Sequence, residues 1–136
     1  MTDIETLLPQ RYPFLFVDKI ISADMDEIIG TKTYETSFLY LQDHQEHQKV
    51  VPSTILIESI VQCGGAGINK IGLCRKSLWG LASIDDVRIL GFVQPNTMVK
   101  MIVKNCKVSD KILKQTGTAY CKGKAVLEAT WMCLRL

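Results

Sequence analysis

The sequence lacks the features of a membrane-spanning or secreted protein. It has no uninterrupted apolar stretch of about 18 residues, the length that a membrane-spanning helix needs. Residues 1–5 include two acidic side chains and lead into no apolar segment of the kind found in signal peptides. The basic excess of a nucleic-acid-binding protein is also missing, since 16 Lys and Arg residues oppose 14 Asp and Glu residues. We therefore expect no membrane span and no nucleic acid partner.

A cysteine pattern that would form disulfides or bind zinc is missing as well. The five cysteines are odd in number and widely spaced, and no two form a C-x-x-C pair. They are Cys63, Cys74, Cys106, Cys121 and Cys133. Buried, reduced thiols are typical of the cytosol, so we expect the protein to be cytoplasmic.

No linker, low-complexity segment or internal repeat divides the chain. Its 136 residues fit a single domain. Hydrophobic residues make up 47% of the sequence, which is enough for an ordinary globular core. We therefore treat residues 1–136 as one domain.

The order of predicted elements indicates an α+β fold. Aromatic and β-branched runs predict strands, and a continuous run after Pro52 predicts a long helix. Helices are expected over 3–8 and 53–71, and strands over 14–21, 28–36, 79–84, 98–108, 113–121 and 126–134. One long helix against a mostly antiparallel sheet is an α+β architecture.

The helix predicted over 53–71 is apolar around most of its circumference, which is typical of a buried helix. Proline is favourable just before or at a helix start, because its missing N–H would be unpaired there. Three glycines, Gly64, Gly65 and Gly67, each cost about 1 kcal/mol relative to alanine in a helix interior. Their presence indicates that another element packs closely against this helix.

Two titratable residues are candidates for chemistry. Glu58 lies inside the apolar helix, where a carboxylate pays a desolvation cost unless it has a partner. A surface position, or a structural hydrogen bond, would also explain Glu58, and a solvated loop would explain His44. Together, however, a His and a Glu near one helix can act as base and acid. The unpaired N–H groups at the helix start can bind an oxyanion, and these three elements are what elimination next to a carbonyl requires.

Neither a metal nor a phosphate site is predicted. Asp43, His44, Glu46 and His47 lie close together, but their segment is very polar and has no clear fourth ligand. Residues 64–67 are rich in glycine, but they lie inside the helical run and have no Gly-Lys-Ser/Thr. We therefore expect no metal and no resident cofactor.

Motifs from residue 8 to residue 133, in order, resemble those of the FabZ-type β-hydroxyacyl-(acyl carrier protein) dehydratases. Residues 8–18 read L-P-Q-R-Y-P-F-L-F-V-D against the family's L-P-H-R-Y-P-F-L-L-V-D, and residues 42–44 read Q-D-H against Q-G-H-F-P-G. Residues 51–58 read V-P-S-T-I-L-I-E against M-P-G-V-L-I-x-E, and residues 59–62 read S-I-V-Q against A-x-A-Q. Residues 84–88, 93–96 and 123–133 resemble the family's G-I-D-x-A-R-F, V-x-P-G-D and G-x-V-V-x-E-A-x-M-x-C.

The resemblance implies a hot-dog fold, in which an antiparallel sheet wraps one central helix. It implies that His44 is the general base and that Glu58, from the partner subunit, is the general acid, because the family's His and Glu have the same separation. It further implies that the backbone N–H of Ser53 binds the thioester carbonyl and that Gln62 supports the active site. The substrate would be a (3R)-3-hydroxyacyl chain on the phosphopantetheine of acyl carrier protein, and the protein a homodimer or a trimer of dimers.

Several positions depart from the family pattern. Asp43 replaces a glycine, Ser53 replaces another, and Gln10 replaces the histidine of the opening motif, while residues 45–47 read Q-E-H instead of F-P-G. The altered loop favours a specialised lipid or polyene pathway over housekeeping fatty-acid synthesis. Two alternatives stay open at this point. One is a hot-dog acyl thioesterase, because the fold hosts both chemistries. The other is a non-catalytic subunit or acyl-carrier-binding partner of a dehydratase.

Overall fold

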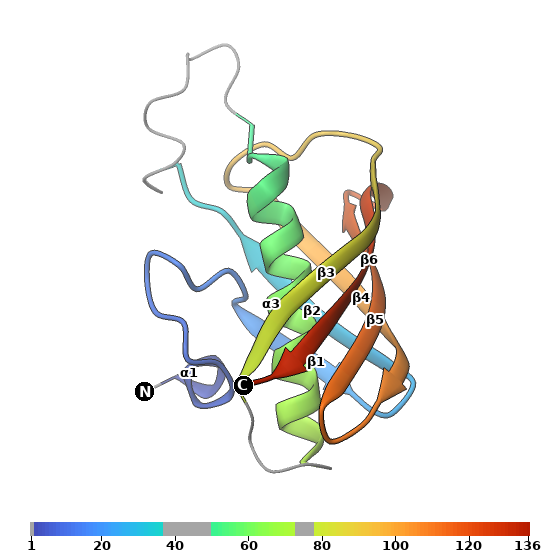
Figure 1. The fold of residues 1–136 in the computed structure, drawn as a ribbon. Helices are drawn as coiled ribbons and strands as arrows, with labels where there is room; N and C mark the ends of the chain where they lie inside the picture. Colours follow the sequence, from blue (N-terminus) through green and yellow to red (C-terminus); the bar gives the residue numbers. More distant parts are fainter. Residues whose placement is uncertain (1, 37–49, 73–77) are drawn as a thin grey trace.

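The computed structural model describes residues 2–36, 50–72 and 78–136. Its main helix, α3 (Ser53–Ile71), lies in the curve of a six-stranded antiparallel sheet with the strand order β1-β2-β4-β5-β6-β3 (Figure 1). The strands are β1 (Lys19–Ala23), β2 (Glu27–Thr33), β3 (Trp79–Ile89), β4 (Met98–Val108), β5 (Ile112–Cys121) and β6 (Lys124–Arg135). A short helix, α1 (Asp3–Leu7), precedes them. The hot-dog architecture expected from the sequence is therefore confirmed.

Both ends of α3 are where the sequence places them. Pro52 is extended, with ψ of 137°, and the helix begins at the next residue. At the other end Gly72 has φ of 73°, a left-handed conformation that favours glycine and commonly ends helices. Lys122 and Gly123 both have positive φ and join β5 to β6 in a tight hairpin.

The strand predicted over 14–21 is wrong in its first half, because β1 begins only at Lys19. The backbone of Phe14 and Phe16 bonds to a side chain of α3 instead of to a neighbouring strand. Phe16 and Val17 of this run are buried although Phe14 is exposed, and a loop that packs against the core can have the same apolar composition as a strand. The strand predicted over 79–84 is also too short, since β3 continues to Ile89.

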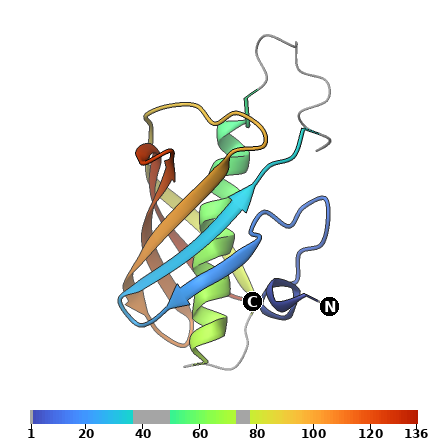
Figure 2. The same ribbon diagram turned by 180° about the vertical axis from the view of Figure 1, so that it is seen from behind.

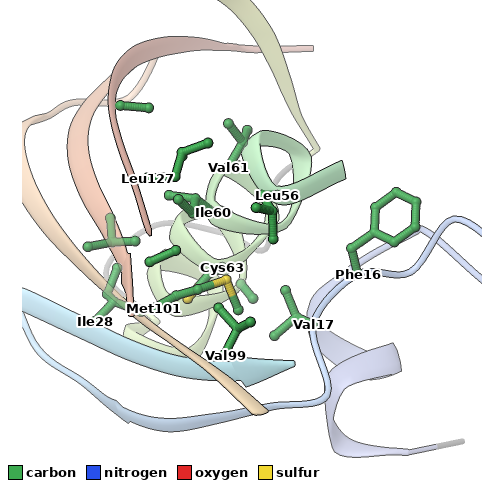
Figure 3. Packing of buried hydrophobic residues seen from close by; sticks show 14 of the residues in the cluster. Phe16, Val17, Ile28, Leu56, Ile60, Val61, Cys63, Val99, Met101 and Leu127 are labelled. Atoms are coloured by element: carbon green, nitrogen blue, oxygen red, sulfur yellow. The ribbon is translucent and has the colours of Figure 1, made fainter. Parts of the chain in front are cut away.

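The core lies between α3 and the concave face of the sheet (Figure 3). The side chains of Ile28, Ile60, Met101 and Leu127 come from four different elements and are fully buried. Burial of side chains of this size contributes about 1.5–3 kcal/mol each. The wrapped sheet therefore covers most of α3, as Figure 2 shows from the opposite side.

Two of the three α3 glycines permit close packing, and the third does not touch a neighbour. A Cβ atom on Gly64 would overlap the Gln115 side chain, and one on Gly67 would overlap Ile28. A Cβ atom on Gly65 would meet no atom within 4 Å. The expectation of close packing is therefore confirmed for Gly64 and Gly67, whereas Gly65 borders open space.

Within the described residues, Cys63, Cys106, Cys121 and Cys133 are free thiols. The same part of the chain holds no group of three or more His, Cys, Asp or Glu side chains placed to bind a metal. None of its helices has the length and apolar character to cross a membrane.

The different surroundings of the glycines predict opposite effects of the same substitution. We expect Gly65→Ala to raise the free energy of unfolding by up to about 1 kcal/mol, through helix propensity alone. We expect Gly67→Ala to lower it, since overpacking against Ile28 costs about 1–3 kcal/mol. Urea denaturation of the two variants beside the wild type measures both changes, and equal stabilities would contradict this account of the packing.

Candidate active site

Glu58 lies in the second turn of α3, near the end of the helix where the chain enters from Pro52. Its side chain is partly buried, and Oε1 accepts a hydrogen bond of 3.1 Å from Nε2 of Gln62, one helical turn further on. The other carboxyl oxygen has no hydrogen-bond partner among the described residues. Within the described part of the chain, Glu58 is therefore held through one oxygen, and its other oxygen can accept a further hydrogen bond.

Gln62 is almost fully buried and connects three parts of the molecule. Its Oε1 accepts from the backbone N–H of Phe16 at 2.8 Å, and its Nε2 donates to the backbone carbonyl of Phe14 at 3.0 Å as well as to Glu58. A buried amide with these partners is restricted to one orientation. Gln62 thus fixes the segment after Pro13 against α3 and orients the Glu58 carboxyl.

A cavity of about 170 Å³ lies beside Glu58. Its α3 wall is formed by residues spaced three or four apart, so that they share one face of the helix: Glu58, Val61, Gln62, Gly65 and Asn69. Residues of the opening segment and of β3 and β6, including Leu8, Gln10, Trp79 and Cys133, close it. An engineered cavity of about 150 Å³ holds a benzene molecule, so this one has room for a short acyl group. Gly65 has no side chain and so does not fill this part of the cavity.

Cys133 is the thiol that lines this cavity. Burial raises the pKa of Cys133 to about 11, and the nearby Glu58 carboxylate contributes in the same direction. The thiol is consequently protonated at neutral pH, and the thiolate is the nucleophilic form. Cys133 therefore contributes an uncharged side chain to the lining of the cavity and is unsuited to attack a thioester.

The other predicted site residues are only partly within the described residues. Ser53 is the first residue of α3, and Pro52 before it provides no side-chain cap to the first amides of the helix. Such uncapped N–H groups carry a partial positive charge. His44 lies outside the described residues, so the prediction that His44 and Glu58 act together stays a prediction.

One supporting pair was missed by the sequence analysis. Tyr34 is fully buried, and its hydroxyl shares a short hydrogen bond with the hydroxyl of Ser59, next to Glu58 in the chain. Burial raises the pKa of Tyr34, so the phenol stays protonated. The pair attaches the chain after β2 to α3. The only signal in the sequence was a tyrosine at the end of a run that is typical of a strand. No local pattern indicated that its hydroxyl bonds to Ser59.

Comparison with known proteins identifies the family. The FabA-like domain model matches residues 8–130. The FabZ 3-hydroxyacyl-[acyl-carrier-protein] dehydratase of Xanthomonas euvesicatoria is 30% identical over 98% of this chain and 90% of its own length. This chain belongs to the FabZ-type dehydratase family. The FabZ protein of Xanthomonas campestris strain B100 is similar at 29% identity over the same shares.

Solved structures agree with this family at the level of the fold. The ApeI:P dehydratase heterocomplex from Xenorhabdus doucetiae matches with a TM-score of 0.84 at 14% identity, over 100% of this chain and 92% of that one. A hypothetical thioesterase from Streptococcus pneumoniae with coenzyme A matches with a TM-score of 0.68 at 10% identity, over 98% and 91%. The hot-dog fold of this FabZ-type chain is thus shared with proteins described as dehydratases and with proteins described as thioesterases.

The contacts of Gln62 predict that its replacement is costly for stability. Gln62→Leu roughly keeps the side-chain size but removes the buried amide that bonds the backbone of Phe14 and Phe16, and the loss of these hydrogen bonds costs about 1–3 kcal/mol. The matched control is Gln94→Leu, because Gln94 is exposed and surface changes usually stay within about 0.5 kcal/mol. Chemical denaturation of both variants provides the comparison. Equal stability of the two would show that Gln62 does not hold the Phe14–Phe16 segment.

Proposed function

We propose that this chain dehydrates a (3R)-3-hydroxyacyl group, carried on acyl carrier protein, to the trans-2-enoyl thioester. The observation that carries the proposal is the Glu58 carboxyl, held through one oxygen by Gln62 at the wall of a cavity large enough for a short acyl group. FabZ relatives that match 98% of the chain are named for this reaction, which supports the assignment.

In the proposed reaction His44 removes a proton from C2 of the substrate. The C2–H electron pair forms the C2=C3 double bond, the C3–O bond breaks, and Glu58 gives its proton to the departing hydroxyl, which leaves as water. The N–H of Ser53, at the uncapped start of α3, donates to the thioester carbonyl oxygen and stabilises the charge that develops there. Phosphopantetheine belongs to the substrate, and the chain supplies the base, the acid and the oxyanion donor.

We further propose that the working unit is a homodimer, whose larger form is a trimer of dimers. β3 is an edge strand of eleven residues, and several of its large apolar side chains are exposed, among them Leu81, Ile84, Val87 and Ile89. A long apolar edge strand is an aggregation hazard unless another strand pairs with it. Pairing of β3 with the same strand of a second copy would join the two sheets and bring Glu58 near His44 of the partner subunit.

The first test is hydration of a crotonyl thioester, followed by loss of the enoyl absorbance. We expect His44→Ala and Glu58→Gln each to lower kcat by about 10²-fold or more, because each removes one proton-transfer group. Glu27→Gln, the same change on the outer face of the sheet, is the matched control and keeps wild-type activity. A folded, dimeric wild type that turns over neither a carrier-protein nor a coenzyme A substrate would refute the dehydratase.

A mixing experiment tests whether the two residues come from different subunits. Inactive His44→Ala and Glu58→Gln proteins are mixed, unfolded and refolded together. Half of the resulting dimers are hybrids, and one of the two sites in each hybrid contains both native residues, so that about one quarter of the wild-type activity returns in a symmetric dimer. If both residues came from the same chain, no site would be restored and the mixture would stay inactive.

A second candidate is a subunit of a hetero-oligomeric dehydratase. The solved structure with a TM-score of 0.84 to this chain is described as a dehydratase heterocomplex, and Asp43 and residues 45–47 depart from the family pattern. This role predicts turnover only after a second hot-dog chain is added to the assay. Release of free thiol from an acyl thioester, with no enoyl product, would indicate the thioesterase alternative instead.

A further inference from the structure

The chain between β3 and β4 makes hydrogen bonds to two segments that lie near the start of α3. The N–H of Val51, which precedes the helix, donates to the carbonyl of Val93 at 2.8 Å. The N–H of Asn96 donates to the carbonyl of Tyr34 at 2.7 Å. Figure 2 shows this connection, in gold and orange, beside the first turns of α3, in green. We refer to residues 93–96 as the β3–β4 turn.

Asn96 has a backbone conformation that few residues adopt. Its φ is 64°, in the left-handed region where glycine is favoured and asparagine is better tolerated than most other residues. The family motif V-x-P-G-D has glycine at the position of Asn96. Glycine would therefore satisfy the backbone geometry of this turn, and the asparagine side chain needs a further explanation.

The side chain of Asn96 bonds to Thr36, beyond the end of β2. Nδ2 of Asn96 donates to Oγ1 of Thr36 at 2.6 Å, and Oδ1 accepts from the backbone N–H of Thr36 at 3.3 Å. The backbone N–H of Asn96 adds the bond to the carbonyl of Tyr34. Asn96 therefore fixes residues 34–36 to the β3–β4 turn through its side chain and its backbone together.

Tyr34 connects this attachment to α3. Its side chain is fully buried, and its hydroxyl bonds to the hydroxyl of Ser59, which is also fully buried. Ser59 directly follows Glu58, and it stands where the family motif A-x-A-Q has alanine. Separating the two hydroxyls would leave buried polar atoms unpaired, which is unfavourable. Asn96 and Ser59 thus depart from the family motifs at the two ends of one series of contacts.

We propose that Asn96 is a positioning residue of the dehydratase reaction, which holds the first two turns of α3 in place through Tyr34 and Ser59. The Glu58 carboxyl and the uncapped N–H of Ser53 both lie in these turns. The inference rests on the proposed function and adds a residue that does not touch the substrate.

The bond from Val51 to Val93 supports the same arrangement, because it ties the chain that leads into α3 to the β3–β4 turn. Both residues are buried, so that this part of the turn is packed as well as hydrogen-bonded. Displacement of reacting groups by about 1 Å can cost about 10²-fold in rate. A small shift of the start of α3 is therefore expected to change kcat.

The test replaces Asn96 by glycine, which keeps the left-handed backbone accessible and removes the two side-chain bonds to Thr36. We expect kcat for hydration of a crotonyl thioester to fall about tenfold, while KM stays within about twofold. Thr36→Val removes the hydroxyl and lowers kcat in the same direction, whereas Thr36→Ser keeps the hydroxyl and the wild-type kcat. Because Asn96→Gly and Thr36→Val break a shared contact, their effects on kcat are not additive in the double variant.

The matched control is Lys122→Gly. Lys122 also has a positive φ, of 52°, and lies in the hairpin turn between β5 and β6. The same substitution there changes backbone freedom without removing a bond to Thr36, and we expect kcat and KM to stay at wild-type values. An equal loss of kcat in the two glycine variants would overturn the proposal. A loss in Asn96→Gly that is no larger than its loss of folded protein in urea would also overturn it, because Asn96 would then act through stability alone.

A second set of variants tests the step from Tyr34 to α3. Tyr34→Phe leaves the buried hydroxyl of Ser59 without this partner, and the addition of Ser59→Ala removes both polar groups. Removal of both partners recovers stability, whereas kcat stays low, because the attachment to α3 is still missing. Recovery of the wild-type kcat in the double variant would overturn positioning through Tyr34.

Backbone amide chemical shifts distinguish failure of the positioning from failure of the proposed function. They are measured by NMR for residues 53–59 in the wild type, Asn96→Gly and Lys122→Gly. If no thioester is turned over but Asn96→Gly alone shifts these amides, the proposed function fails and the positioning of the helix start stands. If thioesters are turned over, and both the amide shifts and the kcat of Asn96→Gly equal those of the wild type, the positioning is wrong.

Discussion

Burial of α3 inside the curved sheet is the constraint from which the rest of this structure follows. A polar group on such a helix must find a hydrogen-bond partner, since leaving it unpaired costs about 1–3 kcal/mol. Gln62 meets this requirement through the backbone of Phe14 and Phe16 and through Glu58 at the same time. The bonds that hold the opening segment to the core are thus also those that orient the proposed acid.

The same burial explains the small residues along α3. Where the sheet comes closest, Gly64 and Gly67 leave space for Gln115 and Ile28. On the face toward β3 and β6, Gly65 instead leaves space that nothing in the described chain fills, and this space belongs to the cavity beside Glu58. One sequence feature therefore serves two purposes, packing on one side of the helix and room for a ligand on another.

The two faces of the sheet differ in character. The concave face is apolar and encloses α3, and the buried polar side chains Ser59 and Gln62 of that helix have hydrogen-bond partners. The convex face carries lysines and exposed apolar side chains, including Lys100 and Met98.

Local patterns in the sequence determined α3 and the overall α+β class, because helix periodicity, proline and glycine act within a few residues of each other. The His44–Glu58 spacing suggested the chemistry through resemblance to a family. Only the tertiary structure decided that residues 14–18 form a loop, because their backbone partner, Gln62, is more than forty positions away. It likewise decided that Cys133 lies beside Glu58, since which buried residues meet depends on how the sheet wraps the helix, and that is not encoded in any local pattern.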